Sequence, residues 1–142
     1  MKLKPIYLFL ITLLTITSCK KDAGTGTDDC ERKVVINKTQ FEEIESDDIV
    51  VSDFTIVGNC LNITVRGSGC DGNSWVVNII DSEEVVNTKP AQRKLRVTLR
   101  NNELCQAYFA RDYSFNLTDL QVEGDSVLLK FEESGEEILY EY

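Results

Sequence analysis

The chain has 142 residues, 42% of them hydrophobic, and a formal net charge of −9 at pH 7. This acidity argues against nucleic acid as a partner, because binding nucleic acid needs Lys and Arg side chains clustered on one face. The sequence contains no histidine, which excludes Ser-His and Cys-His catalytic arrangements and disfavours a zinc site.

The first segment, residues 1–18, has the features of an export signal. Lys2 and Lys4 give it a positive start, and residues 6–17 are uncharged and almost entirely apolar or threonine. As a helix these residues would extend roughly 18 Å, well short of the roughly 30 Å hydrocarbon core of a bilayer. The segment therefore suits a signal peptide better than a transmembrane helix.

The signal ends in Ile16-Thr17-Ser18-Cys19, which resembles the lipobox that lipoprotein signal peptidase cleaves before the cysteine. Small side chains fit the cleavage site between Ser18 and Cys19, and the Cys19 thiol accepts diacylglycerol. We therefore expect Cys19 to be the lipidated first residue of the mature chain, held in the lipid bilayer by several acyl chains such as palmitate. Residues 19–29 contain almost no apolar side chain and are predicted to form a flexible tether.

The remaining residues, 30–142, are predicted to form one domain, since they suffice for one hydrophobic core and not for two. Apolar and polar side chains alternate almost throughout, which indicates strands with one buried face. Turn signals separate the strands, and Gly58-Asn59 predicts a tight hairpin. Strands are expected at residues 54–57, 60–66, 75–79, 95–99, 113–117, 127–131 and 138–142.

One short helix is expected ahead of these strands. Thr39 and Glu42 have the spacing of a capping box, in which Thr39 would be the N-cap and Glu42 would reach back to its N–H group. Phe41 and Ile44 would then share one face of a helix of one or two turns, ending by Asp47.

These elements predict an all-β fold, a single immunoglobulin-like β-sandwich of about seven or eight antiparallel strands, with a barrel as the alternative. Trp75 follows Cys60 by 15 residues, which suits an immunoglobulin domain. However, Cys105 comes only 45 residues after Cys60, and Glu103 stands where the corner tyrosine belongs. The expected likeness therefore concerns architecture and not family membership.

Four cysteines lie in the domain, and an even number in an exported chain predicts two disulfides. A bond between Cys60 and Cys70 would be strained, because the strand after Cys60 spans roughly 20 Å and the residues leading to Cys70 can reverse at most about 14 Å. We therefore favour Cys70–Cys105, which joins two strand exits, together with Cys30–Cys60. The alternative is Cys30–Cys70 with Cys60–Cys105.

No catalytic or metal site is expected in this chain. The Asp-Gly-Asn sequence at residues 71–73 could suggest a calcium loop, but it lacks the further carboxylates of such a loop and predicts a turn instead. The Gly-Ser-Gly sequence at residues 67–69 lacks the helix and lysine of a phosphate-binding loop. With no Cys-x-x-Cys motif and with oxidised cysteines, we expect neither a cofactor nor an enzyme.

Short motifs are spread over nearly the whole chain after the signal. They are Ser18-Cys19-Lys20-Lys21-Asp22, Asn59-Cys60-Leu61-Asn62-Ile63, Ser68-Gly69-Cys70, Leu104-Cys105, residues 115–120 and residues 138–142. Together these motifs resemble a group of small uncharacterised lipoproteins of Bacteroidota. The resemblance implies a Gram-negative envelope with the outer membrane as the usual destination, on its periplasmic or its outer side. Asp125-Ser126-Val127 is also similar to the O-glycosylation sequon of that phylum, and a hairpin turn accounts equally well for it.

Two non-catalytic functions remain open for such a chain. One is a binding module for a peptide, glycan or protein partner of the envelope, and the other is a structural or accessory subunit of an envelope assembly with no small ligand. Exposed aromatic side chains would favour the binding module, whereas core packing would explain buried ones. The aromatic candidates are Trp75, Tyr108, Phe109, Tyr140 and Tyr142, and the adjacent pair at 108 and 109 must point to opposite faces of a strand.

Overall fold

The computed structural model describes residues 29–142, so the expected signal peptide, Cys19 and most of the tether lie outside the described residues. Within residues 29–142 the chain forms nine strands, one α-helix and one 3-10 turn. In chain order these are β1 (Arg32–Lys33), β2 (Val35–Ile36), α1 (Lys38–Glu43), β3 (Val50–Val57), β4 (Cys60–Gly69), β5 (Val76–Val86), β6 (Ala91–Arg100), β7 (Ala107–Asn116), η1 (Thr118–Leu120), β8 (Ser126–Phe131) and β9 (Glu137–Glu141).

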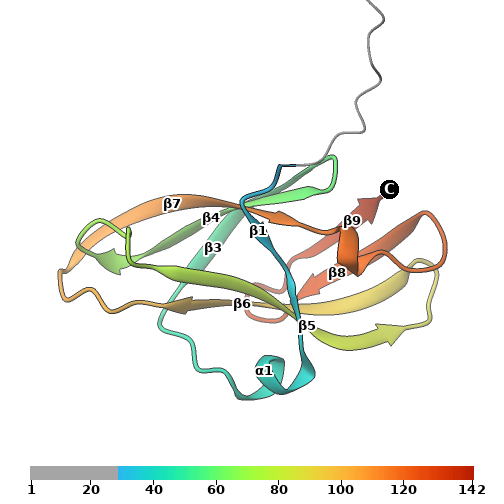
Figure 1. Ribbon diagram of the computed structural model, residues 1–142, viewed down its shortest axis with the longest axis horizontal. Helices are drawn as coiled ribbons and strands as arrows, with labels where there is room; N and C mark the ends of the chain where they lie inside the picture. Colours follow the sequence, from blue (N-terminus) through green and yellow to red (C-terminus); the bar gives the residue numbers. More distant parts are fainter. Residues whose placement is uncertain (1–28) are drawn as a thin grey trace, which may run out of the picture.

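The strands form two sheets that pack face to face (Figure 1). The four-stranded sheet has the order β1-β7-β4-β3, and the five-stranded sheet has the order β2-β5-β6-β8-β9. The all-β sandwich expected from the sequence is therefore confirmed. On one side of the sandwich the chain passes directly from β1 in the first sheet to β2 in the second through Val34, which is buried.

The hydrophobic core lies between the sheets and follows from the alternation along each strand. The four-stranded sheet contributes Leu61, Ile63 and Val65 of β4, and the five-stranded sheet contributes Ile79 of β5 and Leu95 of β6 among others. All five side chains are at most 1% exposed. Burying one such side chain stabilises the fold by roughly 1.5–3 kcal/mol, so the alternating pattern accounts for most of the cohesion between the sheets.

The expectation that all strands are antiparallel is wrong. Three pairs are parallel, namely β1 with β7, β2 with β5, and β6 with β8. The cause is that consecutive strands often belong to different sheets: after β6 the chain enters the four-stranded sheet as β7 and then returns as β8 beside β6. Alternation along a strand reveals its buried face but not the sheet that it joins. Strands β1 and β2 are also too short to show alternation, and the described chain therefore has more strands than expected.

The short helix forms where it was expected, but the prediction of Thr39 as its N-cap is wrong. The N-cap is Asn37, whose side-chain oxygen accepts the N–H group of Gln40 at 2.8 Å. Asn37 also has the extended backbone that an N-cap residue adopts. The helix consequently starts at Lys38, two residues earlier than a cap at Thr39 would allow, and its buried residue is Phe41.

Two disulfides join Cys30 to Cys60 and Cys70 to Cys105, which is the pairing that the sequence favoured. Strand β4 occupies the ten residues from Cys60 to Gly69, so roughly 30 Å of strand separates Cys60 from Cys70. The first disulfide fastens the residues before β1 to the β3–β4 hairpin. The second fastens the β4–β5 loop to the β6–β7 loop at the left-hand end of the sandwich in Figure 1.

Candidate functional site

The aromatic side chains considered from the sequence divide between the core and the surface. Trp75 is 3% exposed and Tyr140 is fully buried, so neither can form a contact face. Phe109 is partly buried and stacks on Trp75, with ring centroids 4.9 Å apart. Tyr108 is 61% exposed, on the opposite face of β7 from Phe109 as expected, and Tyr142 is partly exposed after β9.

The β4–β5 loop encloses the carboxylate of Glu103 with hydrogen-bond donors. Oε2 of Glu103 accepts the backbone N–H groups of Cys70, Asp71 and Gly72, and Oε1 accepts the backbone N–H and the hydroxyl of Ser74. These donors lower the pKa of Glu103 to about 2, and the Gly72 N–H contributes most. The loop is thus a nest of N–H groups that a carboxylate of the chain itself already occupies, and it leaves no free anion site.

Residues 71–73 form the turn that the sequence predicted. An oxygen of the Asp71 side chain accepts the N–H of Asn73 at 2.9 Å, and the Arg111 guanidinium donates to the Asp71 carbonyl and the Asn73 side-chain oxygen. The oxygen atoms that a calcium ion would need are therefore engaged by donors. No group of three His, Cys, Asp or Glu side chains that could hold a metal occurs within residues 29–142.

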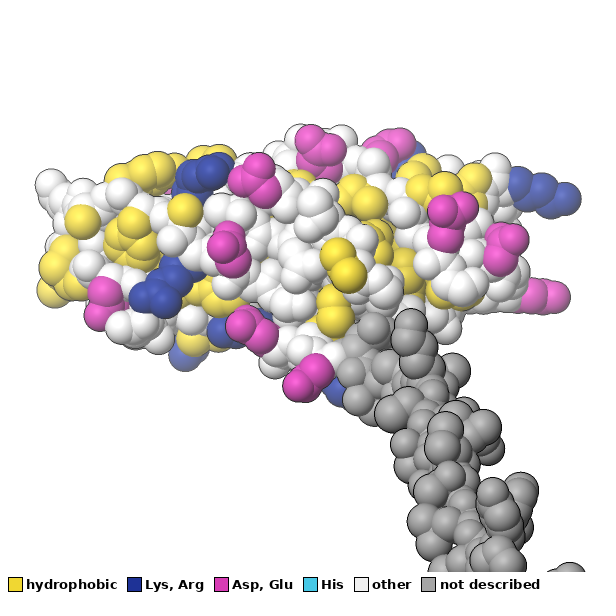
Figure 2. Space-filling model, turned by 90° about the horizontal axis from the view of Figure 1, so that it is seen from above, with side chains coloured by type: hydrophobic (Ala, Val, Ile, Leu, Met, Phe, Trp, Pro, Cys, Tyr) yellow, Lys and Arg dark blue, Asp and Glu magenta, His cyan; other side chains and the backbone are white. Residues whose placement is uncertain are grey.

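Exposed hydrophobic side chains gather at this end of the sandwich, where β4 and β6 end and β5 and β7 begin (Figure 2). Leu104 is 96% exposed, and Tyr108 and Val76 are also exposed. The Cys70–Cys105 disulfide and the hydrogen bonds of Glu103 hold the loops beneath these side chains. This end of the sandwich therefore presents exposed apolar side chains on a rigid support.

A groove of about 600 Å³ lies between the edge strand β3 and the β8–β9 hairpin, on the side of the sandwich where the last strands of both sheets meet. Its volume falls within the range of small-ligand sites, so it can hold a few side chains of a partner. We call it the β3 groove; its lining consists of residues 49–54, Val97, Phe131, Glu133, Ser134, Glu136 and Ile138.

A bulge in β3 shapes one wall of the β3 groove. Ile49 and Val51 precede the bulge, and Phe54 and Ile56 follow it. All four side chains pack against the core, although a regular strand would point the odd-numbered and the even-numbered residues to opposite faces. The extra residue is Asp53, whose φ of 56° is rare for a residue other than glycine. The bulge thereby turns both Val51 and Phe54 inward, where they border the groove.

The floor of the β3 groove is apolar. The ring of Phe54 in β3 lies 4.8 Å, centroid to centroid, from the ring of Phe131 in β8, so this pair bridges the two sheets beneath the groove. Phe131 and Val97 are almost fully buried, while Val51 and Ile138 are partly buried against the core. An apolar side chain entering the groove would cover the remaining exposed parts of these residues.

The rim of the β3 groove carries three carboxylates, Asp53, Glu133 and Glu136, and no lysine or arginine is among the lining residues. The Asp53 carboxylate accepts the hydroxyl of Ser52 at 2.7 Å and a guanidinium N–H of Arg66 at 3.3 Å. These contacts lower the pKa of Asp53, the Ser52 hydrogen bond most of all, so Asp53 is charged at neutral pH.

Arg96 fixes the second carboxylate of the rim. Its Nε donates to Glu133 at 2.8 Å, and its Nη1 donates to the carbonyl oxygens of Phe41 and Ile44, which end α1. The turn between β8 and β9 is thereby tied to the helix. Glu136, on the same turn, is exposed and forms no ion pair with the described residues. The rim therefore presents at least one uncompensated negative charge beside the apolar floor.

Sequence reasoning missed the β3 groove. It expected a strand only at residues 54–57, whereas β3 begins at Val50. A signal was present in the change of parity from Ile49 and Val51 to Phe54 and Ile56, because a bulge is the ordinary way in which a strand changes parity. The other wall comes from residues some 80 positions later in the chain, and no local pattern indicates that these two segments meet.

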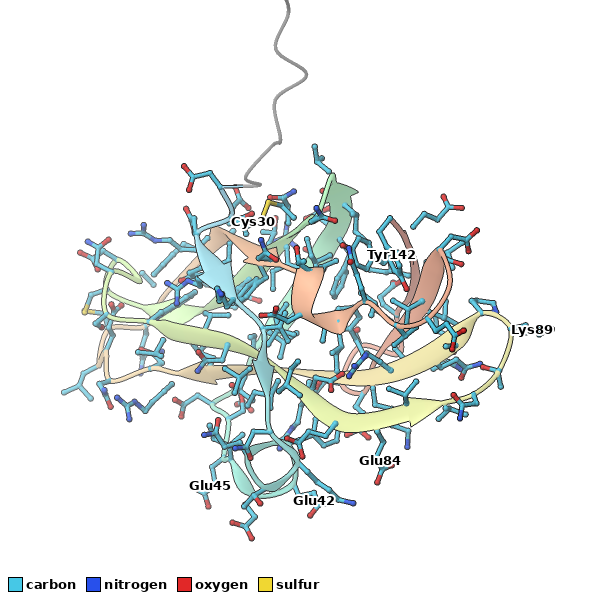
Figure 3. The ribbon with its side chains drawn as sticks, turned by 45° about the vertical axis from the view of Figure 1, so that its right-hand side comes forward. Cys30, Glu42, Glu45, Glu84, Lys89 and Tyr142 are labelled. Atoms are coloured by element: carbon cyan, nitrogen blue, oxygen red, sulfur yellow. A yellow bond between two sulfur atoms is a disulfide. The ribbon has the colours of Figure 1, made fainter. Side chains whose placement is uncertain are left out.

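The expected lipidation and cleavage residues, Cys19 and Ser18, lie outside residues 29–142. In the part of the chain that the structure describes, no helix is long and apolar enough to cross a membrane. Cys30 lies at the edge of the domain opposite Glu42 and Glu45, which project from α1 and the loop after it (Figure 3).

No family model and no curated protein matches the chain. Among solved structures, a NigD-like immunity protein from Bacteroides caccae has a TM-score of 0.53 and 12% identity, covering 78% of this chain and 59% of that one. A protein of unknown function, DUF1344, from Bacteroides vulgatus has a TM-score of 0.49 and 20% identity, covering 78% of this chain and 55% of that one.

The chain thus spans less than two thirds of the length of either neighbour. At 12% identity the likeness to the NigD-like protein concerns the fold alone.

Proposed function

We propose that the chain is a lipid-anchored protein of the bacterial outer membrane, without catalytic activity, whose β-sandwich binds a protein or peptide partner at the β3 groove. The observation that carries the binding role is the groove itself, which has an apolar floor and an acidic rim and lies beside an unpaired edge strand. An apolar hollow with a few placed polar groups is typical of binding sites.

A protein or peptide suits the β3 groove better than a glycan does. Sugars stack on exposed aromatic faces, whereas Trp75 and Tyr140 are buried and the exposed Tyr108 lies outside the groove. The rings of the groove itself, Phe54 and Phe131, contact each other, and Phe131 is almost fully buried. Apolar side chains of a polypeptide would fill such a floor more readily than hydroxyl groups, which would lose hydration there without a partner.

The anchoring role is supported by the sequence that ends at Cys19. The fold is compatible with it, because Cys30 enters the domain at one edge and the Cys30–Cys60 disulfide fastens that entry point. A flexible tether of about ten residues between Cys19 and Cys30 would span roughly 17 Å, enough to let the domain turn above the bilayer.

The alternative function, a structural subunit without a small ligand, is favoured by a different observation. Leu104, in the β6–β7 loop, and Tyr108, near the start of β7, expose apolar surface close to the Cys70–Cys105 disulfide. Exposed apolar side chains on a rigid support are typical of protein–protein contacts. In that case the partner would cover the left-hand end of the sandwich in Figure 1 and leave the β3 groove free.

Photo-cross-linking in the producing bacterium distinguishes these functions. A photoreactive phenylalanine analogue replaces Val50, which lines the β3 groove and is 53% exposed. The matched control is Val86, at the end of β5 in the other sheet, which is 44% exposed and lies outside the groove lining. We expect a covalent adduct with a second protein from position 50 and not from position 86. Adducts only from a probe at Leu104 would contradict the groove and support the alternative.

A further inference from the structure

We propose that the partner contributes an extended segment rich in apolar and basic side chains, which adds as a strand to the free edge of β3. This inference rests on the proposed function and specifies the chemistry of its ligand. Three properties of the β3 groove support it: the unpaired backbone of β3, the direction of that backbone's hydrogen-bonding groups, and the charge of the rim.

Among the sheet edges of the described chain, β3 is the least protected. Each of the edge strands β1 and β2 has only two residues, and β9 carries glutamates at both ends, Glu137 and Glu141. Strand β3 has eight residues, of which Asp53 alone is charged, and it contains no lysine or proline. Natural proteins usually blunt exposed edges with short strands, charges, bulges or proline. The bulge at Asp53 interrupts the edge of β3, but residues 50–52 and 54–57 on either side of it are uncharged and remain candidates for strand pairing.

The backbone groups that β3 leaves free can be assigned from the pairing with β4. Val57 and Cys60 close a two-residue turn, whereas the carbonyl of Asn59 accepts the N–H of Leu117 on the far side of β4. Because successive residues of an antiparallel strand alternate in direction, the N–H and C=O groups of Val51 and Ile56 point away from β4. Within residues 29–142 no backbone hydrogen bond satisfies them.

A strand added to this edge would send side chains into the β3 groove. Residues directly opposite each other in neighbouring strands share one face of the sheet. The side chain of Val51 faces the core, so the partner residue opposite Val51 would point its side chain to the same face, onto Phe54 and Ile138. Main-chain hydrogen bonds would give affinity, and the apolar floor would select alternate side chains.

The charge of the rim selects a basic partner segment. Asp53, Glu133 and Glu136 surround the groove, and Glu136 has no ion-pair partner among the described residues. A lysine or arginine of the ligand that lies beside the β8–β9 turn would pair with this carboxylate. Two other occupants of the groove fit less well. A second copy of the chain would bring two acidic rims together. The chain's own residues 22–29 include three aspartates and a single apolar residue, Ala23, to cover the floor. A partner segment of opposite charge therefore fits better than either.

The test uses the full chain in detergent and the capped peptide Lys-Val-Lys-Val-Lys-Val-Lys as probe. We expect saturable binding that shifts the NMR signals of the Val51 and Ile56 amides. Two further probes carry N-methyl groups either on the three valines or on the inner lysines, which blocks one edge of the peptide at a time. Because strand pairing uses one edge only, one methylated peptide should bind at least tenfold more weakly and the other within about twofold. Loss with methylated valines indicates antiparallel addition, and loss with methylated lysines indicates parallel addition.

Protein variants test the charge. Glu136→Lys should weaken peptide binding at least threefold, whereas the control Glu141→Lys, on β9 but outside the groove, should leave it unchanged. Strand addition is refuted if both methylated peptides bind like the parent or lose affinity equally. A dimer in sedimentation that excludes the peptide would also refute it. If these tests fail while the adduct at position 50 persists, the proposed function stands and only the strand mode is wrong; if both fail, the groove is not the site.

Discussion

The Glu103 carboxylate accepts the backbone N–H of Gly72 at 3.0 Å, and this contact closes the loop end of the sandwich. Gly72 has a φ of +69°, and a Cβ atom there would lie 2.7 Å from a ring carbon of Phe109. Glycine is therefore needed both for the turn and for the close approach of the Phe109 ring. The loop reaches this shape because a single carboxylate gathers its N–H groups.

Replacing Glu103 by Gln should destabilise the domain in a pH-dependent way. The pKa of Glu103 is lowered from 4.5 to about 2 in the folded state, so its stabilising effect is complete above pH 4.5 and is lost as the pH falls through 2. The melting temperatures of wild type and Glu103→Gln should therefore differ most at neutral pH and converge towards pH 2. Glu141→Gln, at an exposed position, is the control. A difference that stays constant with pH would contradict the assigned pKa.

Removing the Cys70–Cys105 disulfide with paired serine substitutions should lower the free energy of unfolding by about 2–4 kcal/mol, because the bond closes a long loop in the unfolded chain. Urea denaturation of the oxidised proteins measures the difference. The Cys30–Cys60 disulfide closes a loop of similar length, so paired serine substitutions at these two positions should lower the free energy of unfolding by a similar amount. Peptide mapping without reductant checks the connectivity, and a main product that joins Cys60 to Cys70 would overturn it.

The absence of a Cys60–Cys70 disulfide was accessible from the sequence because it depends on strand length alone, whereas the choice between the two remaining pairings rested on the position of Cys105 at a strand exit. Once Cys60 is placed at the start of a long strand, Cys70 must lie at its far end, and a strand exit near Cys105 is the natural partner. The core was accessible for a similar reason, since Leu61, Ile63 and Val65 alternate with polar residues. Local spacing therefore sufficed wherever the structure is a property of one strand.

Features that depend on how distant segments meet were not accessible in this way. The parallel pairing of β6 with β8 depends on an excursion through the other sheet, and the β3 groove joins residues 49–54 to the β8–β9 hairpin. The role of Glu103 was also missed, although the disulfide at Cys105 brings it beside the loop that follows Cys70. A paired cysteine close to a carboxylate and a glycine-rich loop is the signal that could have indicated it.

Replacing Cys19 by Ala should abolish acylation and leave the uncleaved precursor, because the thiol is the acceptor of diacylglycerol. Metabolic labelling with an alkyne fatty acid in the producing bacterium measures this. Ser18→Ala keeps a small residue before the cysteine and should still be labelled, which makes it the matched control. Labelling of the Cys19→Ala chain at the level of the control would refute the lipobox.

A buried ion pair offers a last test of what stabilises the sandwich. Asp81 is 0% exposed, and its Oδ1 accepts Arg93 Nη1 at 2.8 Å and the N–H of Glu83 at 2.8 Å. Oδ2 of Asp81 and Nε of Arg93 have no hydrogen-bond partner in the part of the chain that the structure describes. Burial raises the pKa of Asp81, and the nearby Arg93 charge only partly opposes this shift. The pair therefore bears a desolvation cost that its single strong contact does not fully offset.

Removing only the cation should accordingly lower the free energy of unfolding far more than removing both charges. Arg93→Met leaves an uncompensated buried carboxylate and should cost about 3–5 kcal/mol of unfolding free energy at neutral pH. Because the folded-state pKa of Asp81 is raised, this loss should shrink as the pH falls towards 3.8 and the carboxyl group takes up a proton. The double variant Asp81→Asn/Arg93→Met keeps an acceptor for the Glu83 N–H and should recover most of the stability. Urea denaturation at pH 7 and pH 4 checks this, and a double variant no more stable than Arg93→Met would show that the ion pair itself stabilises the fold.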